Sequence, residues 1–177
     1  MKKLLLGVVL GFAIVFAAAY LYFSRGYAPV ATSAPPMPFE ETMAKMALNA
    51  RIAKEAPSTS PIPVNDANLL AGVRLYRENC AVCHGLSGQA ETAIAKGMYP
   101  KPPQFFGGHG VTDDPPGETF WKSKNGIRLT GMPGFGQSMS DPQLWQVSLM
   151  LAQADKLPAG VQKLLAESPA PTPSTQK

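Results

Sequence analysis

Two cysteines and a histidine stand together in the run Cys80-Ala81-Val82-Cys83-His84, and the sequence has no other cysteine. In a C-x-x-C-H run, each thiol can form a thioether with a haem vinyl group, and the adjacent imidazole can then reach the iron from one face. Such a chain must fold around a large planar group. The run therefore predicts one covalent haem c, attached through Cys80 and Cys83, with His84 as an iron ligand.

Three other interpretations of the cysteine pair are a zinc site, a redox-active dithiol and a structural disulfide. Zinc needs about four ligands, and only His109 follows the motif as a further histidine. A thioredoxin-like dithiol needs a surrounding βαβ pattern, whereas the flanks of this motif have helical and loop-like patterns. A disulfide between residues this close would constrain little of the unfolded chain. Haem attachment fits the sequence best.

The N-terminal run Leu4–Phe23 is uncharged and long enough to cross a bilayer, which takes roughly 20 residues in a helix. Lys2 and Lys3 precede the run and favour a cytoplasmic N-terminus. A cleaved signal peptide is the alternative, because the small residues Ala17–Ala19 offer a cleavage site. Residues 1–24 are thus expected to be a membrane anchor or a signal, and the continuing apolar residues favour the anchor. Aromatic residues lie at its far end like an interfacial belt: Tyr20, Tyr22, Phe23 and Tyr27.

The prolines divide the chain, because they gather in short segments instead of spreading along it. Proline fixes φ and has no backbone N–H, so these segments indicate linkers and loops. The sequence predicts a proline-rich linker at residues 25–63 that contains a helix at Glu40–Lys54. The main folded domain is expected at 64–166, followed by a disordered tail at 167–177. The net charge of +4 is too small to indicate nucleic-acid binding.

Helical periodicity is clear before the cysteine pair. A helix is predicted to begin at a cap on Asn65 or Asp66 and to run to about Asn79. Gly72 lies on the apolar face of this helix, where it lowers helix propensity, and its position makes sense if a second helix crosses closely there. The other members of that face are spaced i, i+4 and i+7: Leu69, Val73 and Tyr76.

A second strong helix signal begins at Ser140, because Gln143 completes a capping box and Pro142 fits the first turn. Between the two helices, Leu86–Gly110 is predicted to be mostly loop. A loop of that length is uncommon unless it serves a function, and enclosing a haem is such a function. Shorter elements are expected at Ala90–Ala95, Glu118–Asn125 and Pro158–Glu167.

Residues from about Val64 to Ala166 resemble the small single-haem cytochromes c. The resemblance rests on Gly72 and Tyr76, the run Cys80–Gly85, Asn125-Gly126-Ile127, Gly131-Met132-Pro133 and Leu144-Trp145. It implies a cytochrome c fold, all-α and wrapped around one haem, preceded here by a single transmembrane helix and the linker. It also implies that the first helix of the domain crosses the last one at the position of Gly72. The axial ligands of the iron are then expected to be a histidine and a methionine. The ligating histidine is expected to be held by a proline carbonyl from Pro100, Pro102 or Pro103.

The resemblance makes Met132 the expected sixth ligand of the metal, because it belongs to the Gly-Met-Pro motif. The residues agree, since the glycines beside it allow the backbone to come close to a planar macrocycle. Packing alone would account for Met139, before a helix cap, and for Met150, within a helix. Three residues downstream of the motif stay open as further candidates for this ligand: Met98, His109 and Met139. Two residues are candidates to contact haem propionates: Trp121 and Arg128.

His/Met ligation fills both axial positions, so the resemblance implies one-electron transfer, with no catalytic residue and no enzymatic reaction. The chain is expected to be a carrier held in a bacterial inner membrane by its N-terminal helix, with the haem domain in the periplasm and redox proteins as partners. The alternative is a fixed haem subunit of a dehydrogenase or haem-copper oxidase complex. A haem gas sensor or peroxidase would need an open sixth site. Cations after the cysteine pair are candidates to steer an acidic partner: Lys96, Lys101, Lys122, Lys124 and Arg128.

Overall fold

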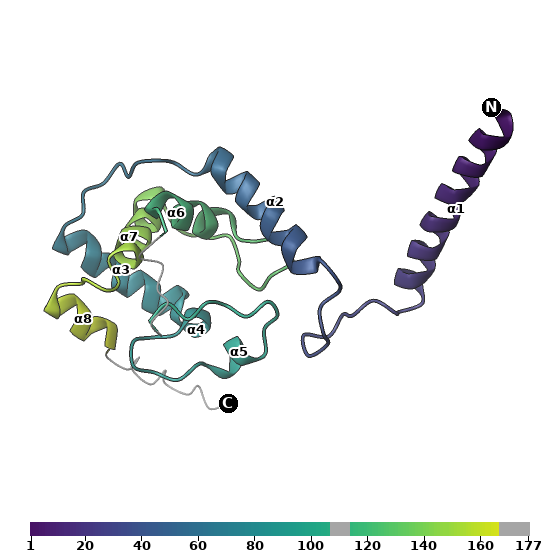
Figure 1. The fold of residues 1–177 in the computed structure, drawn as a ribbon. Helices are drawn as coiled ribbons and strands as arrows, with labels where there is room; N and C mark the ends of the chain where they lie inside the picture. Colours follow the sequence, from purple (N-terminus) through teal and green to yellow (C-terminus); the bar gives the residue numbers. More distant parts are fainter. Residues whose placement is uncertain (107–113, 167–177) are drawn as a thin grey trace. The chain divides into compact units, whose positions relative to one another are not determined.

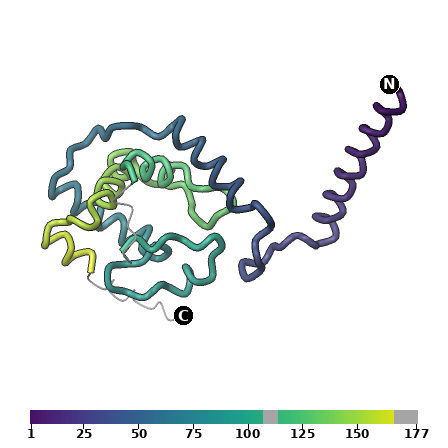
Figure 2. The backbone as a smooth tube through the Cα atoms, in the orientation of Figure 1, coloured from purple at the N-terminus to yellow at the C-terminus, as the bar shows by residue number. Residues whose placement is uncertain are grey.

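The computed structural model describes residues 1–106 and 114–166, and within these ranges it contains helices, turns and loops but no strand (Figures 1 and 2). The predicted all-α class is therefore confirmed for the described residues. The chain divides into two compact units, Met1–Ala44 and Lys45–Lys177. The tail predicted at 167–177 lies outside the described residues.

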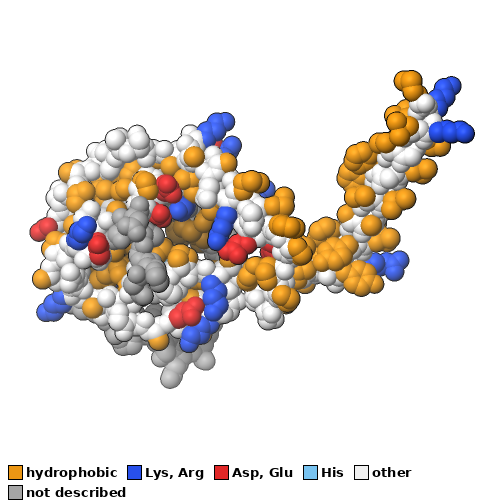
Figure 3. All heavy atoms as spheres, in the orientation of Figure 1, with side chains coloured by type: hydrophobic (Ala, Val, Ile, Leu, Met, Phe, Trp, Pro, Cys, Tyr) orange, Lys and Arg blue, Asp and Glu red, His pale blue; other side chains and the backbone are white. Residues whose placement is uncertain are grey.

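The first unit is dominated by α1 (Lys2–Ser24), a helix whose residues are all exposed. At about 1.5 Å per residue, its 23 residues reach roughly 35 Å, which exceeds the hydrocarbon thickness of a bilayer. Figure 3 shows hydrophobic side chains along the length of this helix. The helix is long and apolar enough to cross a membrane, and a signal sequence has the same properties. At its C-terminal end, the ring of Tyr22 stacks on that of Tyr27 in the following segment, with centroids 6.4 Å apart.

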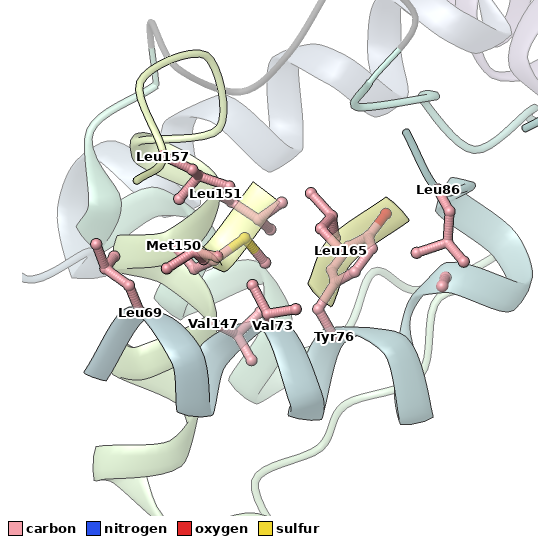
Figure 4. Close-up of a cluster of buried hydrophobic side chains, with 11 residues drawn as sticks. Leu69, Val73, Tyr76, Leu86, Val147, Met150, Leu151, Leu157 and Leu165 are labelled. Carbon is pink, nitrogen blue, oxygen red and sulfur yellow. The ribbon is translucent and has the colours of Figure 1, made fainter. Parts of the chain in front are cut away.

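The core of the second unit is built where α3 (Asp66–Asn79) crosses α7 (Asp141–Ala152), with α8 (Ala159–Ala166) packed on α3. Hydrophobic side chains from all three helices interdigitate there (Figure 4). Burying each large side chain stabilises the fold by about 1.5–3 kcal/mol relative to leaving it exposed. The members of this cluster that Figure 4 labels are Leu69, Val73, Tyr76, Leu86, Val147, Met150, Leu151, Leu157 and Leu165.

Gly72 lies at the crossing of α3 and α7. A Cβ added there would collide with the backbone carbonyl of Gln146 and would come within 2.9 Å of the Cβ of Met150. The two helix backbones are therefore so close that only a residue without a side chain fits between them. This confirms the close helix crossing that the position of Gly72 predicted.

A second, smaller cluster joins α7 to α6 (Pro116–Asn125). The rings of Phe120 and Trp145 stack with centroids 4.4 Å apart and planes 14° apart, and Leu144 is buried beside them. Partly buried side chains from outside both helices pack against this aromatic cluster (Phe120, Leu144 and Trp145): Ile62, Phe135 and Met139.

Local capping rules located most helix boundaries. The helix α2 (Glu40–Glu55) begins at the predicted residue. The cap of α3 is Asn65, whose side chain accepts a hydrogen bond from the amide of Asn68 at 2.9 Å. Ser140 and Gln143 form the predicted capping box of α7. The helix α6 starts at Pro116, two residues earlier than predicted, because proline is well suited to a first turn.

Replacing Gly72 with alanine should test the crossing. We expect Gly72→Ala to lower the free energy of unfolding by about 1–3 kcal/mol, because the methyl group meets backbone that cannot rotate away. This loss should exceed the roughly 1 kcal/mol by which alanine favours a helix. The control is Gly160→Ala in α8, where an added Cβ meets no atom within 4 Å. Denaturant unfolding measures both variants. Equal stability of Gly72→Ala and the wild type would contradict the close crossing.

Candidate haem-binding site

The cysteine pair and the histidine lie on one short helical turn, α4 (Ala81–His84), which directly follows α3. The carbonyl of Cys80 accepts hydrogen bonds from the amides of Cys83 and His84, at 3.0 and 2.9 Å. Both cysteines are free thiols and both are partly exposed. A single turn of chain thus brings together the three side chains that the motif requires.

The chemistry of Cys80 does not suit disulfide exchange. Burial raises the pKa of its thiol to about 12, and the neighbouring Cys83 contributes to that rise. Only the thiolate attacks a disulfide, so reactive dithiols have lowered pKa values instead. A redox-active C-x-x-C pair is therefore disfavoured.

Three side chains from separate segments hold the carbonyls of this turn. Tyr76 of α3 donates its hydroxyl to the carbonyl of Gly85 at 2.7 Å. Gln104 donates its amide to the carbonyl of Cys83 at 2.9 Å. Thr92 donates its hydroxyl to the carbonyl of Val82 at 2.6 Å. The last carbonyls of a helix lack partners within it, so these bonds fix the turn that carries the cysteines and the histidine.

His84 is nearly buried, and its ring is fixed on two sides. Its Nδ1 lies 2.9 Å from the carbonyl oxygen of Pro103, which identifies the acceptor among the three candidate prolines. Its ring stacks on Phe105, with centroids 4.4 Å apart and planes 6° apart. In the tautomer that donates from Nδ1, the other nitrogen, Nε2, keeps a lone pair for a metal. Burial lowers the pKa of His84, and the bond to Pro103 opposes that shift.

Met132 is partly buried in a loop that runs from Ile127 to Gly136 and is attached to the end of α6. Within the loop, the amide of Ile127 donates to the carbonyl of Met132 at 3.2 Å. The amide of Met132 donates to the hydroxyl of Thr130 at 3.1 Å. The loop then returns to α6, where the amides of Phe135 and Gly136 donate to the carbonyls of Ser123 and Lys124 at 2.9 and 3.0 Å.

Glycine is required at the base of this Met132 loop (residues 127–136). Gly126 ends α6 with a φ of 68°, a value that side-chain-bearing residues rarely adopt. A Cβ added there would lie 2.5 Å from the amide nitrogen of Gly134 and 2.9 Å from the carbonyl of Met132. The backbone of this loop therefore packs tightly against the end of α6.

The remaining candidates for the sixth ligand lie in different surroundings. Met150 is fully buried in the core between α3 and α7. Met139 packs against the aromatic cluster. Met98 lies beside the Met132 loop, because its methyl group occupies the space that a Cβ on Gly131 would need. His109 lies outside the described residues.

The polar residues near α6 have local partners. The indole N–H of Trp121, a candidate propionate contact, donates to the carboxylate of Glu55 at 3.1 Å. Lys122 pairs with Asp114 and Glu118, at 3.4 and 3.5 Å. Lys124 contacts both carboxylate oxygens of Asp141, at 2.7 and 2.9 Å. Acidic neighbours thus offset two of the five cations expected to steer a partner.

With this geometry established, residues 67–149 match the family model described as cytochrome c oxidase, cbb3-type, subunit III. The match includes the C-x-x-C-H turn, the Met132 loop and most of α7, and it covers a little under half of the chain. These residues form a c-type cytochrome domain with the all-α cytochrome c fold.

A solved structure is also similar, namely a chain of the reducing HAO-like protein complex of Kuenenia stuttgartiensis. The two chains share 22% identity with a TM-score of 0.44, and the similarity covers 54% of this chain and 47% of that one. This chain thus spans about half the length of the solved chain. A comparison with curated proteins found no match.

Thr92, Gln104 and Phe105 were not predicted from the sequence, since contacts of loop residues across the fold leave no local pattern.

Gln104 offers a test of the hydrogen bonds around α4. We expect Gln104→Ala to lower the free energy of unfolding by about 1–2 kcal/mol, because the carbonyl of Cys83 loses its donor. The control is Gln137→Ala, at an exposed glutamine. Both variants are measured by denaturant unfolding of the haem-loaded protein. An equal free energy of unfolding for the two variants would contradict the role of Gln104.

Proposed function

We propose that this protein carries one electron on a haem c bound covalently to Cys80 and Cys83, with His84 and Met132 as the axial ligands. The observation that carries the proposal is the α4 turn, which presents two thiols and an imidazole held by Pro103. The c-type cytochrome domain supports the same assignment. The described residues fit a haem c, because both thiols are free to form thioethers and Nε2 of His84 remains available to bind the iron.

The bound haem supplies a one-electron iron couple, and the residues of this chain set its conditions. The carbonyl of Pro103 orients the ring of His84 and makes it a better electron donor to the metal. Phe105 restricts rotation of that ring by stacking on it. A thioether from Met132 raises the reduction potential relative to a second nitrogen ligand and leaves no open position for substrate. This arrangement favours an electron carrier over an enzyme.

A retained anchor is part of the proposal. The helix α1 would hold the protein in a bacterial inner membrane, and the lysines at its start favour a cytoplasmic N-terminus. The haem domain then lies in the periplasm, where it exchanges electrons with membrane or soluble redox proteins.

A second candidate function is a fixed haem subunit of an oxidase complex, and the description of the matching family favours it. Purification in mild detergent distinguishes the two functions. A carrier is expected to separate from other redox proteins, whereas a subunit should co-purify in a constant ratio with a catalytic partner. A sensor or peroxidase would instead bind carbon monoxide readily in the reduced wild-type protein.

Replacing Met132 tests the ligand assignment. We expect Met132→Ala to abolish the weak long-wavelength absorption band of methionine bound to ferric haem and to open the iron to carbon monoxide. The reduction potential should fall by on the order of 0.2 V, within the roughly 0.8 V range that axial ligands control. The controls are Met98→Ala and Met139→Ala, which should keep the band. If either control loses the band while Met132→Ala keeps it, the assignment is wrong.

Membrane fractionation tests the anchor. We expect the mature protein to stay in the membrane pellet after washing with alkaline carbonate, because α1 is buried in lipid. A variant lacking Leu4–Phe23 and exported by a separate cleavable signal should be soluble. Recovery of the wild type in the soluble fraction, with a mature N-terminus at Tyr20, would show a cleaved signal instead.

A further inference from the structure

We propose that residues 45–63, here called the strap, form a positioning element for the Met132 loop. The inference rests on the proposed ligand role of Met132 and goes beyond it, because it assigns a task to a segment that the sequence indicated only as linker and helix. The strap contains the second part of α2 and the proline-rich segment that follows it. Figure 2 shows the chain continuing from α2 to the start of α3, and the contacts below attach it to α6 and α7.

The helical part of the strap has one buried apolar residue. Ile52 is 4% exposed, whereas Arg51, Ala53, Lys54 and Glu55 around it are exposed or only partly buried. An isoleucine buried to this extent on an otherwise solvated helix must pack against other parts of the fold. The strap therefore carries an apolar contact of its own.

Next along the strap, the carboxylate of Glu55 joins two side chains. One oxygen accepts from the indole N–H of Trp121 on α6 at 3.1 Å. The other oxygen lies 2.9 Å from Nε of Arg51, one turn earlier on α2. The pairing with Arg51 orients the Glu55 carboxylate toward Trp121, and this carboxylate thereby links α2 to α6.

The strap backbone comes very close to α6 at Gly117. A Cβ added to this buried glycine would collide with the carbonyl of Pro57. Its φ is not in the positive range, so the conformation does not require glycine there. The missing side chain instead leaves space for the strap backbone, which fits a docked segment.

The end of the strap shares a cluster with the Met132 loop. Ile62 packs against the aromatic cluster of α6 and α7, and so does Phe135 of the loop. The strap then ends at Pro63, whose carbonyl accepts a hydrogen bond from the side-chain amide of Asn68 on α3 at 2.8 Å. Ile62 and Phe135 therefore depend on the same rings for their packing.

The helix α6 connects the two segments directly. Its first turn contacts the strap through Gly117, and its last turn accepts the hydrogen bonds of Phe135 and Gly136 from the Met132 loop. A change in the position of the strap therefore alters the support of α6, and α6 sets where the loop holds Met132. This makes the strap a positioning element that acts through α6 and touches no reacting atom.

The test uses the full-length, haem-loaded protein in detergent with the substitution Gly117→Ala. The added methyl group should displace the strap, so we expect tryptic cleavage at Arg51 and Lys54 to rise roughly tenfold through easier local opening. The methionine–iron absorption band should weaken, and carbon monoxide should bind faster to the reduced protein. Gly160→Ala serves as the control and should change none of these. If Gly117→Ala fails to fold, Glu55→Ala removes the strap's acceptor for the Trp121 indole N–H, leaves α6 unaltered and gives the same readouts.

These readouts distinguish docking of the strap from its positioning role. Faster cleavage with an unchanged band and unchanged carbon monoxide binding would overturn the positioning role, since the strap would then only be docked. Unchanged cleavage would contradict the docking itself. A wild-type protein without the methionine–iron band would refute the ligand assignment of Met132, and the positioning role with it, independently of any variant.

Discussion

The structure depends on one requirement, which is that a single turn of chain must hold two thiols and an imidazole in fixed directions. The turn α4 has only four residues, too few to be stable as an isolated helix. It is stabilised by side chains outside it: Thr92 and Gln104 donate to the carbonyls of Val82 and Cys83, and Tyr76 donates to the carbonyl of Gly85, which ends the turn. The contact between His84 and Pro103 extends the same support to the imidazole. The loops around α4 thus fix the turn and the imidazole together.

Tyr76 connects this turn to the hydrophobic core. It is fully buried in α3, in the cluster formed where α3 crosses α7, and its hydroxyl reaches the carbonyl of Gly85. Burial raises the pKa of this hydroxyl well above its ordinary value, so it remains a donor across the physiological pH range. The close crossing at Gly72 therefore supports both the fold and the position of α4.

Sequence reasoning succeeded where the physics is local. Capping residues and apolar periodicity placed α3 and the start of α7 to within about two residues, the expected bounds of α2 agree equally well, and Gly72 predicted the helix crossing. It failed where partners are distant in sequence. The packing of Phe105 on His84 and the contact of Pro57 with Gly117 follow from tertiary structure alone. Lys122 and Lys124 were candidates to steer an acidic partner, yet each lies beside a carboxylate that the sequence did not pair with it.

The central claim is that the chain carries one haem by covalent attachment at Cys80 and Cys83. The intact mass of the purified protein, measured after acid denaturation, tests it most directly. We predict the mass of the mature chain plus one haem, and a bound haem that resists extraction with acidified acetone. A chain that has the mass of the polypeptide alone, with all its haem released into the solvent, would contradict the claim.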